Sequence, residues 1–279
     1  MRWTDRQQAM LQAMGLRLWA PEGGADGEPL ALTSDVGTDD AATVPASVPP
    51  LVSRSAAPQP APAPLPAAGP PALSPAGAAV AMLDWPALRA AVADCRACML
   101  CETRTQTVFG VGHPRAHWMV VGEAPGEQED LKGEPFVGAA GRLLDRMLAA
   151  LGLSRQVGDD PDAADVARQV YIANTLKCRP PRNRNPEPEE LQRCQPFLER
   201  QVELVQPRVI LAMGRFAVQS LLDSSEPIGR LRGRVHQWRG RPLVVTYHPA
   251  YLLRSPADKA RAWADLCLAA RAAETKPAG

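Results

Sequence analysis

The chain contains, at residues 117–130, the stretch HWMVVGEAPGEQED, in which a short apolar run leads into a glycine-rich turn and a cluster of carboxylates. Trp118–Val121 is apolar, rich in β-branched residues and bounded by turn residues, which predicts a buried strand. Ligands of open α/β sheets bind beyond the carboxyl ends of the strands. We therefore expect a ligand at the Gly122–Gly126 turn, with Glu123 at its rim.

The alternation of apolar runs and helical segments continues along the chain. Further strands are predicted at Val170–Asn174, Val209–Met213 and Leu243–Thr246. Helices are predicted at Asp84–Asp94, Arg142–Leu151, Glu189–Val205, Phe216–Leu222 and Pro256–Ala273. Strands that alternate with helices imply parallel β/α units and one sheet covered on both faces.

Length, charge and hydropathy limit the classes of protein. The 279 residues suffice for one or two domains. Residues 1–80 carry 4 Lys and Arg against 7 Asp and Glu, a net charge of −3, and the remainder carries 27 against 23, a net charge of +4. A polyanion partner is thus permitted but not required. Without a membrane-length apolar run or a signal-peptide core, we expect a cytoplasmic protein without a membrane partner.

The first 80 residues differ in composition from the rest. Residues 1–20 place apolar side chains at helical spacing, which fits a helix that docks on a partner, with a marginal helical tail as the alternative. Residues 13–19 loosely resemble the start of the psi subunit of the bacterial clamp loader, and this resemblance implies a replication or repair protein as the partner. Residues 21–80 are dominated by Ala, Pro, Gly, Ser and Thr. They cannot bury enough apolar surface to become ordered, so we predict a disordered linker. The globular domain is expected at residues 81–275.

Polar side chains stand at the ends of three of the four predicted strands. Glu123 follows the first strand, Asn174 ends the second and His248 follows the fourth. Each of them alone is commonly a helix cap or a loop corner. Because the carboxyl ends of parallel strands share one sheet edge, we expect the three side chains to meet in one crevice.

Four cysteines are spaced as metal ligands, and disulfides are not expected in the cytoplasm. Cys95 and Cys98 form a Cys-x-x-Cys pair, and Cys178 and Cys194 flank a Pro-rich loop. Four thiolates from two segments would make a closed site for zinc or for an iron–sulfur cluster, and their spacing does not separate the two. Buried free thiols are the alternative, and Cys101 is a spare ligand candidate.

Several longer motifs occur together in one order: GEAPG at 122–126, GEPFVG at 133–138, NTLKCRPPRNRNP at 174–186 and YHPAYLL at 247–253. With them, residues 84–270 resemble the family 4 uracil-DNA glycosylases, the iron–sulfur members of the uracil-DNA glycosylase superfamily. The resemblance implies a four-stranded parallel sheet in an α/β/α sandwich. It implies a [4Fe–4S] cluster on Cys95, Cys98, Cys178 and Cys194. It also implies hydrolysis of the N-glycosidic bond of deoxyuridine in DNA, which leaves an abasic site and initiates base-excision repair.

That reaction implies a role for each residue of the crevice. The base must leave the stack, so such an enzyme flips it into a pocket. Phe136 would stack on the flipped ring, and Asn174 would bind the O4 and N3–H edge of uracil and reject cytosine. His248 would donate to O2 as negative charge grows on the leaving base. Backbone N–H groups and a close approach to the sugar would come from the turn Gly122, Ala124, Pro125 and Gly126.

The group that activates water is less well defined. In the best-known branch of the superfamily an Asp occupies the place of Ala124, and alanine cannot activate water. Glu123 is the nearest replacement, and Glu129 and Asp130 are the next candidates. Glu129 could instead block the space next to C5 of uracil and so exclude thymine, because Gly126 replaces a tyrosine that does so in other members of the superfamily.

Two loops fit contact with single- or double-stranded DNA. Leu252, Leu253 and Arg254 follow the His-Pro turn, and an apolar wedge there would fill the space that the flipped base leaves. Phosphate contacts are expected from Arg179, Arg182, Arg184 and residues 231–234, with a solvated charged surface as the alternative.

The sequence as a whole predicts a monomeric uracil-DNA glycosylase without lyase activity, because no lysine is obviously placed for Schiff-base chemistry. Two alternatives remain. One is a branch of the superfamily that binds uracil-DNA covalently through a His in an Arg-rich loop, although the loop after Asn174 contains no His. The other is a non-catalytic iron–sulfur module that only binds DNA.

Overall fold

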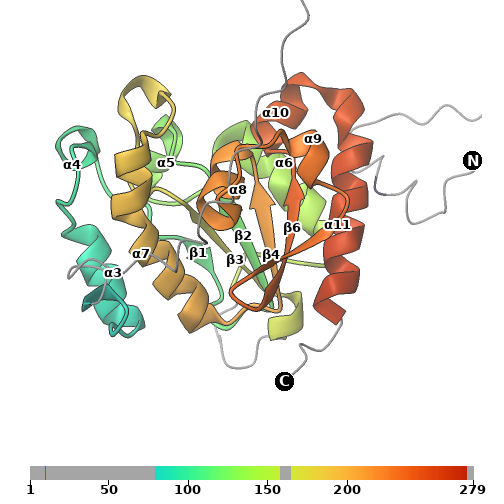
Figure 1. Ribbon diagram of the computed structural model, residues 1–279, viewed down its shortest axis with the longest axis horizontal. Coiled ribbons are helices and arrows are strands. Elements are labelled where there is room, and N and C mark those ends of the chain that lie inside the picture. The colour runs from blue at the N-terminus through green and yellow to red at the C-terminus, as the bar shows by residue number, and fades with distance from the viewer. Residues whose placement is uncertain (1–9, 11–78, 158–164, 275–279) are drawn as a thin grey trace, which may run out of the picture. The chain divides into compact units, whose positions relative to one another are not determined.

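The computed structural model describes residue 10 and residues 79–157 and 165–274 (Figure 1). Within these ranges six strands form one sheet in the order β1-β3-β2-β4-β6-β5. The strands are β1 (Val111–Gly112), β2 (Trp118–Gly122), β3 (Val170–Asn174), β4 (Val209–Met213), β5 (Val235–Trp238) and β6 (Arg241–Thr246).

The four central strands are parallel and the two edge strands are antiparallel. β3, β2, β4 and β6 pair in parallel register, whereas β1 and β5 pair antiparallel with β3 and β6. The predicted four-stranded parallel sheet is therefore confirmed, and two edge strands extend it. Neither edge strand contains a buried apolar run, because β1 has two residues and β5 alternates exposed with half-buried ones.

Helices connect the strands, and some of them begin at a side chain that caps the helix. The Asp84 side chain accepts a hydrogen bond from the Ala87 N–H at 2.9 Å and so caps α3. The helices are α3 (Trp85–Ala93), α4 (Leu100–Thr103), α5 (Glu127–Lys132), α6 (Gly138–Ala149), α7 (Pro188–Val205), α8 (Arg215–Leu222), α9 (Ile228–Leu231), α10 (Pro249–Arg254) and α11 (Lys259–Glu274). No helix in the described ranges is long and apolar enough to cross a membrane.

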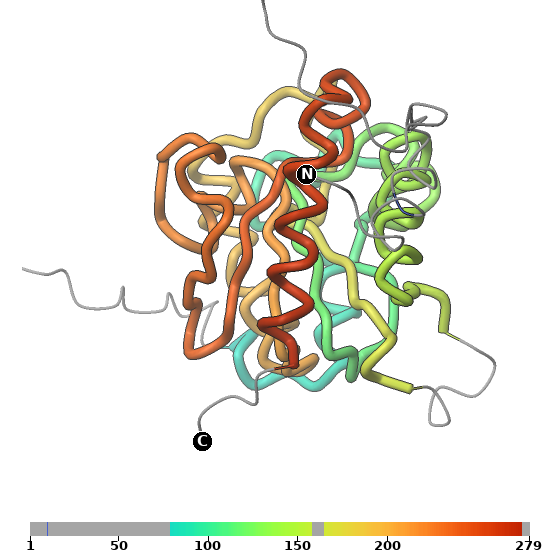
Figure 2. The backbone as a smooth tube through the Cα atoms, turned by 90° about the vertical axis from the view of Figure 1, so that its right-hand side faces the viewer, coloured from blue at the N-terminus to red at the C-terminus, as the bar shows by residue number. Residues whose placement is uncertain are grey.

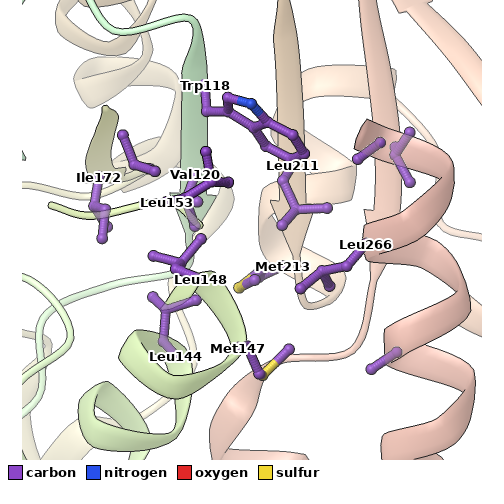
Figure 3. Packing of buried hydrophobic residues seen from close by; sticks show 14 of the residues in the cluster. Trp118, Val120, Leu144, Met147, Leu148, Leu153, Ile172, Leu211, Met213 and Leu266 are labelled. Atoms are coloured by element: carbon purple, nitrogen blue, oxygen red, sulfur yellow. The ribbon is translucent and has the colours of Figure 1, made fainter. Parts of the chain in front are cut away.

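The sheet is covered by helices on both faces. Trp118 and Val120 of β2 pack into one buried cluster with side chains of α6 and α11, as Figure 3 shows. Met119 and Val121 point to the opposite face and pack with side chains of α7 and α8. In Figure 2, α11 runs in red across the strands on the side toward the viewer. The result is the predicted α/β/α sandwich, whose packed core fixes the positions of the strand ends.

The predicted docking helix at residues 1–20 and the predicted linker at residues 21–80 lie almost entirely outside the described residues. Within the former, the structure describes Met10, which is helical, 3% exposed and part of the core cluster that contains Trp263 of α11. Of the latter it describes residues 79–80.

Candidate functional site

A cavity of about 250 Å³ opens beyond the carboxyl ends of the parallel strands. Glu123, Asn174 and His248 all line it, so the three strand-end side chains meet in one crevice. They stand after β2, at the end of β3 and after β6. The cavity wall also includes Ala124, Pro125, Gly126, Glu129, Phe136, Ala140, Pro180, Asn183, Arg184 and Ala250.

Gly122 lies against two side chains of the cavity wall, those of Asn174 and Phe136. A Cβ atom at this position would stand 2.5 Å from both Asn174 Oδ1 and Phe136 Cζ, so only glycine allows them to approach the strand end. The adjacent turn is tied to β3, because the Thr175 N–H donates to the Gly122 carbonyl at 3.0 Å and the Leu176 N–H donates to the Glu123 carbonyl at 3.1 Å. The turn is therefore fixed to the end of β3.

Asn174 is 2% exposed and lies opposite Gly122 in the parallel register. Its backbone carbonyl accepts a hydrogen bond from Lys177 Nζ at 2.8 Å, and that ammonium also donates to Gln201 Oε1 at 2.6 Å. Burial lowers the pKa of Lys177 to about 8, an effect that nearby Cys194 and Cys178 oppose. This buried lysine therefore fixes the backbone of Asn174 from behind the cavity.

His248 presents a neutral imidazole to the cavity. Its Nδ1 accepts a hydrogen bond from the Ala250 N–H at 3.2 Å, where His248 caps α10. The proton of the neutral ring is therefore on Nε2. Burial, with a smaller contribution from Arg254, lowers the pKa of His248 to about 4, so the ring is uncharged at neutral pH. Its ring stacks on Phe136, with centroids 5.2 Å apart and planes at 25°.

Glu123 is a partly buried carboxylate at the rim of the cavity. Burial raises the pKa of Glu123, and the charge of Arg215 at the start of α8 opposes the shift. A carboxylate with a raised pKa in a cavity is a candidate proton acceptor. Glu123 therefore stays the first candidate for water activation.

The two other acidic candidates bind backbone groups. Glu129 accepts from the Gly126 N–H through Oε2 at 3.1 Å and from the Val137 N–H through Oε1 at 3.0 Å. Both oxygens of Asp130 accept from the Thr105 N–H at 3.0 Å, and Asp130 is 2% exposed. Asp130 is not among the residues that line the cavity. Its predicted candidacy for water activation is wrong, because its carboxylate holds the preceding loop instead.

The predicted apolar wedge needs a correction. Leu252 is 0% exposed and belongs to the core cluster between the sheet and α11, so it is not available to DNA. The helical turn of α10 points Leu253 outward, where it is 44% exposed, and Arg254 is exposed beside it. Of the two leucines predicted for the wedge, only Leu253 is thus accessible at the surface.

Two of the predicted phosphate-binding arginines are engaged within the fold. Arg184 forms a two-point ion pair with Glu190, at 2.9 and 2.6 Å. Arg232 forms another with the buried Asp265, at 3.0 and 2.9 Å. Arg182 and Arg234 are exposed. The exposed pair is thus better suited to phosphate contacts than Arg184 or Arg232.

A second cavity lies beside the first and is lined by five cysteines: Cys95, Cys98, Cys101, Cys178 and Cys194. Arg104 Nη1 donates to Cys178 Sγ at 3.0 Å, and the Lys177 N–H donates to Cys194 Sγ at 3.3 Å. Burial raises the pKa of Cys98 and Cys178, and it raises the pKa of Cys194 to about 12. Burial thus disfavours the thiolate form of these three cysteines, and a bound metal group would favour it.

The cysteines do not form the tight group that one metal ion needs. Among the described residues, no three His, Cys, Asp or Glu side chains are placed to hold a single ion. A four-iron cluster spreads its ligands more widely, because each thiolate binds a different iron. The donor set, four or five thiols around one cavity with Arg104 beside it, fits such a cluster better than a single zinc ion.

Fold and cavity together define a protein of the open α/β class, with a ligand site at the carboxyl edge of a parallel sheet. The sequence model of the uracil DNA glycosylase superfamily matches residues 109–267. The chain therefore belongs to this superfamily, and the resemblance seen in the sequence is confirmed.

Individual relatives point to one branch of the superfamily. The chain is 46% identical over 173 residues to the type-4 uracil-DNA glycosylase of Archaeoglobus fulgidus, an alignment that covers 59% of this chain and 81% of that protein. It is 41% identical over 172 residues to the type-4 enzyme of Thermotoga maritima, with 61% and 83% covered. The type-5 uracil-DNA glycosylase of Thermus thermophilus is 34% identical over 153 residues, with 50% and 68% covered. The chain is thus more similar to these type-4 members.

Proposed function

We propose that this chain is a uracil-DNA glycosylase, which hydrolyses the N-glycosidic bond of deoxyuridine in DNA and so initiates base-excision repair. The observation that carries the proposal is the convergence of Phe136, Asn174, His248 and Glu123 on one cavity at the sheet edge. The type-4 and type-5 relatives are named for this activity, which supports the proposal.

Base recognition requires an aromatic face and a fixed hydrogen-bonding edge. Phe136 is 5% exposed and provides the face on which a flipped uracil stacks. The Asn174 amide accepts from the uracil N3–H and donates to O4. Cytosine presents the reversed pattern there, so it would leave buried groups of the immobilised Asn174 unpaired. The Gly122–Gly126 turn contributes backbone N–H groups and room for the sugar.

Bond cleavage is driven by His248 and Glu123. As the C1′–N1 bond breaks, its electron pair moves onto the uracil ring, and negative charge grows on O2. The Nε2–H of neutral His248 donates to that oxygen and stabilises the departing anion. Water attacks C1′, and Glu123 accepts the proton that the water loses. A neutral donor suits this step because its hydrogen bond strengthens as the charge develops.

DNA contacts surround the mouth of the cavity. Leu253 is the exposed apolar side chain that fills the space in the stack after the base has left. Arg254 follows it and is placed for a phosphate contact, together with Arg182. These contacts serve uracil-containing DNA of either form, single-stranded or double-stranded.

The cysteine cavity is proposed to hold a [4Fe–4S] cluster on Cys95, Cys98, Cys178 and Cys194. When bound, the iron ions of such a cluster would favour the thiolate form of these cysteines, and the four residues would join segments that are far apart in sequence. Arg104, which donates to Cys178 Sγ, would stabilise the net negative charge of such a site. The chain's own residues would thereby hold the loop after Asn174 in place.

Further properties are proposed on the same basis. We expect no lyase activity, because none of the lysines in the described part of the chain lines the base cavity. Lys177 is closest in sequence to Asn174, and its ammonium is bound behind the cavity to a carbonyl and to Gln201. We also expect a cytoplasmic monomer. Residues 1–20 would dock on a replication or repair protein, with residues 21–80 as the linker to the domain at 81–275.

A single oligonucleotide experiment separates this function from its alternatives. A labelled strand with one uracil is incubated with the protein and then treated with alkali. Cleavage at uracil after alkali supports the glycosylase, and cleavage before alkali contradicts the absence of lyase activity. A mobility shift without cleavage would indicate a DNA-binding module, and an adduct that survives SDS would indicate the covalent branch.

A further inference from the structure

The backbone of Phe136 adopts a conformation that a bulky residue rarely takes. Its φ angle is +54°, in the left-handed region that favours glycine. Strain of this kind persists where surrounding contacts enforce it, and it concentrates at functional sites. Phe136 is also the aromatic face of the cavity. The contacts that hold its backbone therefore bear directly on base binding.

Arg155 supplies one half of these contacts. Its side chain is 7% exposed, and its guanidinium donates to the Pro135 carbonyl at 2.8 Å and to the Phe136 carbonyl at 3.1 Å. A third carbonyl, that of Gly141 in α6, accepts at 3.4 Å. A Cβ atom at Gly141 would lie 1.7 Å from the Phe136 oxygen, so the helix backbone packs directly on the same carbonyl.

Glu129 supplies the other half. The Val137 N–H, which belongs to the same peptide unit as the Phe136 carbonyl, donates to Glu129 Oε1 at 3.0 Å. The second oxygen of Glu129 accepts from the Gly126 N–H in the turn at the cavity rim. The Phe136–Val137 peptide is thus held at its oxygen by a cation and at its nitrogen by an anion. Charged partners make both hydrogen bonds stronger than neutral ones.

We propose that Arg155 is a positioning residue for base recognition: with Glu129 it fixes the Phe136–Val137 peptide and so keeps the Phe136 ring where a flipped uracil stacks. The proposal deepens the proposed function and rests on it, because it requires uracil to bind against Phe136. A purely structural role would instead centre on the ion pair of Arg155 with Asp145, at 2.6 Å. The Asp145 side chain is 51% exposed. An ion pair with Asp145 would not require Arg155 to donate to three backbone carbonyls as well.

The first test compares Arg155→Lys and Arg155→Met with Asp145→Asn as the matched control. Inhibition of excision by free uracil reports base binding, and kcat and KM are measured on a uracil oligonucleotide. Arg155→Met should weaken inhibition by free uracil about tenfold, in the range expected for losing an aromatic stack on one base. Arg155→Lys should weaken it less. Asp145→Asn should change it less than about twofold, because the carbonyl contacts remain.

The second test places Arg155→Lys in a Phe136→Ala background. If Arg155 acts through the Phe136 ring, the double variant should bind free uracil no more weakly than Phe136→Ala alone. An additive loss, or an equal loss from Asp145→Asn, contradicts the proposal. A wild-type protein that releases no uracil contradicts the proposed function, and the Arg155 proposal falls with it. An active wild type with additive variants contradicts the Arg155 proposal alone.

Discussion

The base cavity and the cysteine cavity are both lined by one short segment of the chain, residues 174–180, and they are built in different ways. Asn174 lines the first cavity, and Cys178, four residues later, lines the second. Three candidate side chains of the base cavity, Glu123, Asn174 and His248, stand at strand ends that the sheet itself brings together. The cysteines come from loops, from the short helix α4 and from the interior of α7, and they converge without a common element of secondary structure.

The fold itself therefore positions the side chains of the base cavity, whereas the cysteine cavity needs a bound group to hold its residues together. Two residues of the base cavity already have hydrogen-bonded supports, the Ala250 N–H for the His248 ring and Lys177 Nζ for the Asn174 backbone carbonyl. The thiols of Cys178 and Cys194 are instead buried, and burial raises the pKa of both, so a bound metal group would be needed to favour their thiolate form. Substitutions in the base cavity should therefore change turnover, and substitutions in the cysteine cavity should mainly change stability and bound iron.

The largest effect is expected from His248→Ala. Loss of the Nε2–H donor should lower kcat by about 10²–10³-fold, the usual consequence of removing one donor to a developing anion. DNA affinity, measured by fluorescence anisotropy, should change less than about threefold, because the donor acts mainly in the transition state. His236→Ala is the matched control, since His236 lies on edge strand β5 and binds the Leu231 carbonyl. Equal losses in kcat and affinity would contradict a leaving-group role.

The next effect concerns pH. Burial raises the pKa of Glu123, and the proposed base must be ionised. As pH falls through that raised pKa, Glu123 becomes protonated and kcat should fall about tenfold per pH unit. His248 has a pKa of about 4 and stays neutral over most of this range. Glu123→Gln should lower kcat and flatten the acid limb. An acid limb that survives in Glu123→Gln would assign it to another group.

A smaller effect on turnover is expected from Cys178→Ala. This variant should lose the bound iron, about four atoms per chain, together with the visible absorbance of the cluster. Thermal unfolding should begin at a lower temperature, while any folded fraction keeps kcat within about tenfold of the wild type. Cys267→Ala is the control, because Cys267 lies in α11 outside the cysteine cavity. A colourless wild-type protein that contains zinc would contradict the cluster.

The smallest effect on turnover is expected from Leu253→Ala, compared with Leu252→Ala. Leu253→Ala should lower kcat/KM on duplex DNA severalfold and less on single strands, where no stack must be refilled. Its unfolding free energy should change by less than about 0.5 kcal/mol, as for exposed sites. Leu252→Ala should cost about 2–5 kcal/mol of stability, because it opens a cavity in the core. A large loss of stability in Leu253→Ala, with a loss of activity on duplex DNA in Leu252→Ala, would contradict the orientation of α10.

The parallel strands could be predicted from the sequence because each is a short apolar run with turn residues at its end. The convergence of Glu123, Asn174 and His248 followed from that topology. The buried face of α10 could not be predicted, because in a six-residue helix the apolar residues Leu252 and Leu253 are neighbours and either could face the core. Strand β1 was missed because two residues carry no periodicity.

Arg155 is the clearest case of a residue whose role the sequence pattern does not predict. It lies in a polar loop, and its partners are backbone carbonyls 14–20 residues earlier, which have no side-chain signature. Glu129 illustrates the same limit. It lines the base cavity, as a candidate site residue should, but its two hydrogen bonds to the backbone of Gly126 and Val137 could not be predicted from an acidic cluster.

The most direct measurement of the central claim is the amount of free uracil released from a uracil-containing oligonucleotide, compared with the number of abasic sites formed in the same reaction. The structure predicts that wild-type protein releases one uracil for each abasic site and leaves the strand intact until alkali is added. His248→Ala should bind the same DNA and release uracil at least about a hundredfold more slowly. DNA binding by the wild type without any release of uracil would contradict the proposed function.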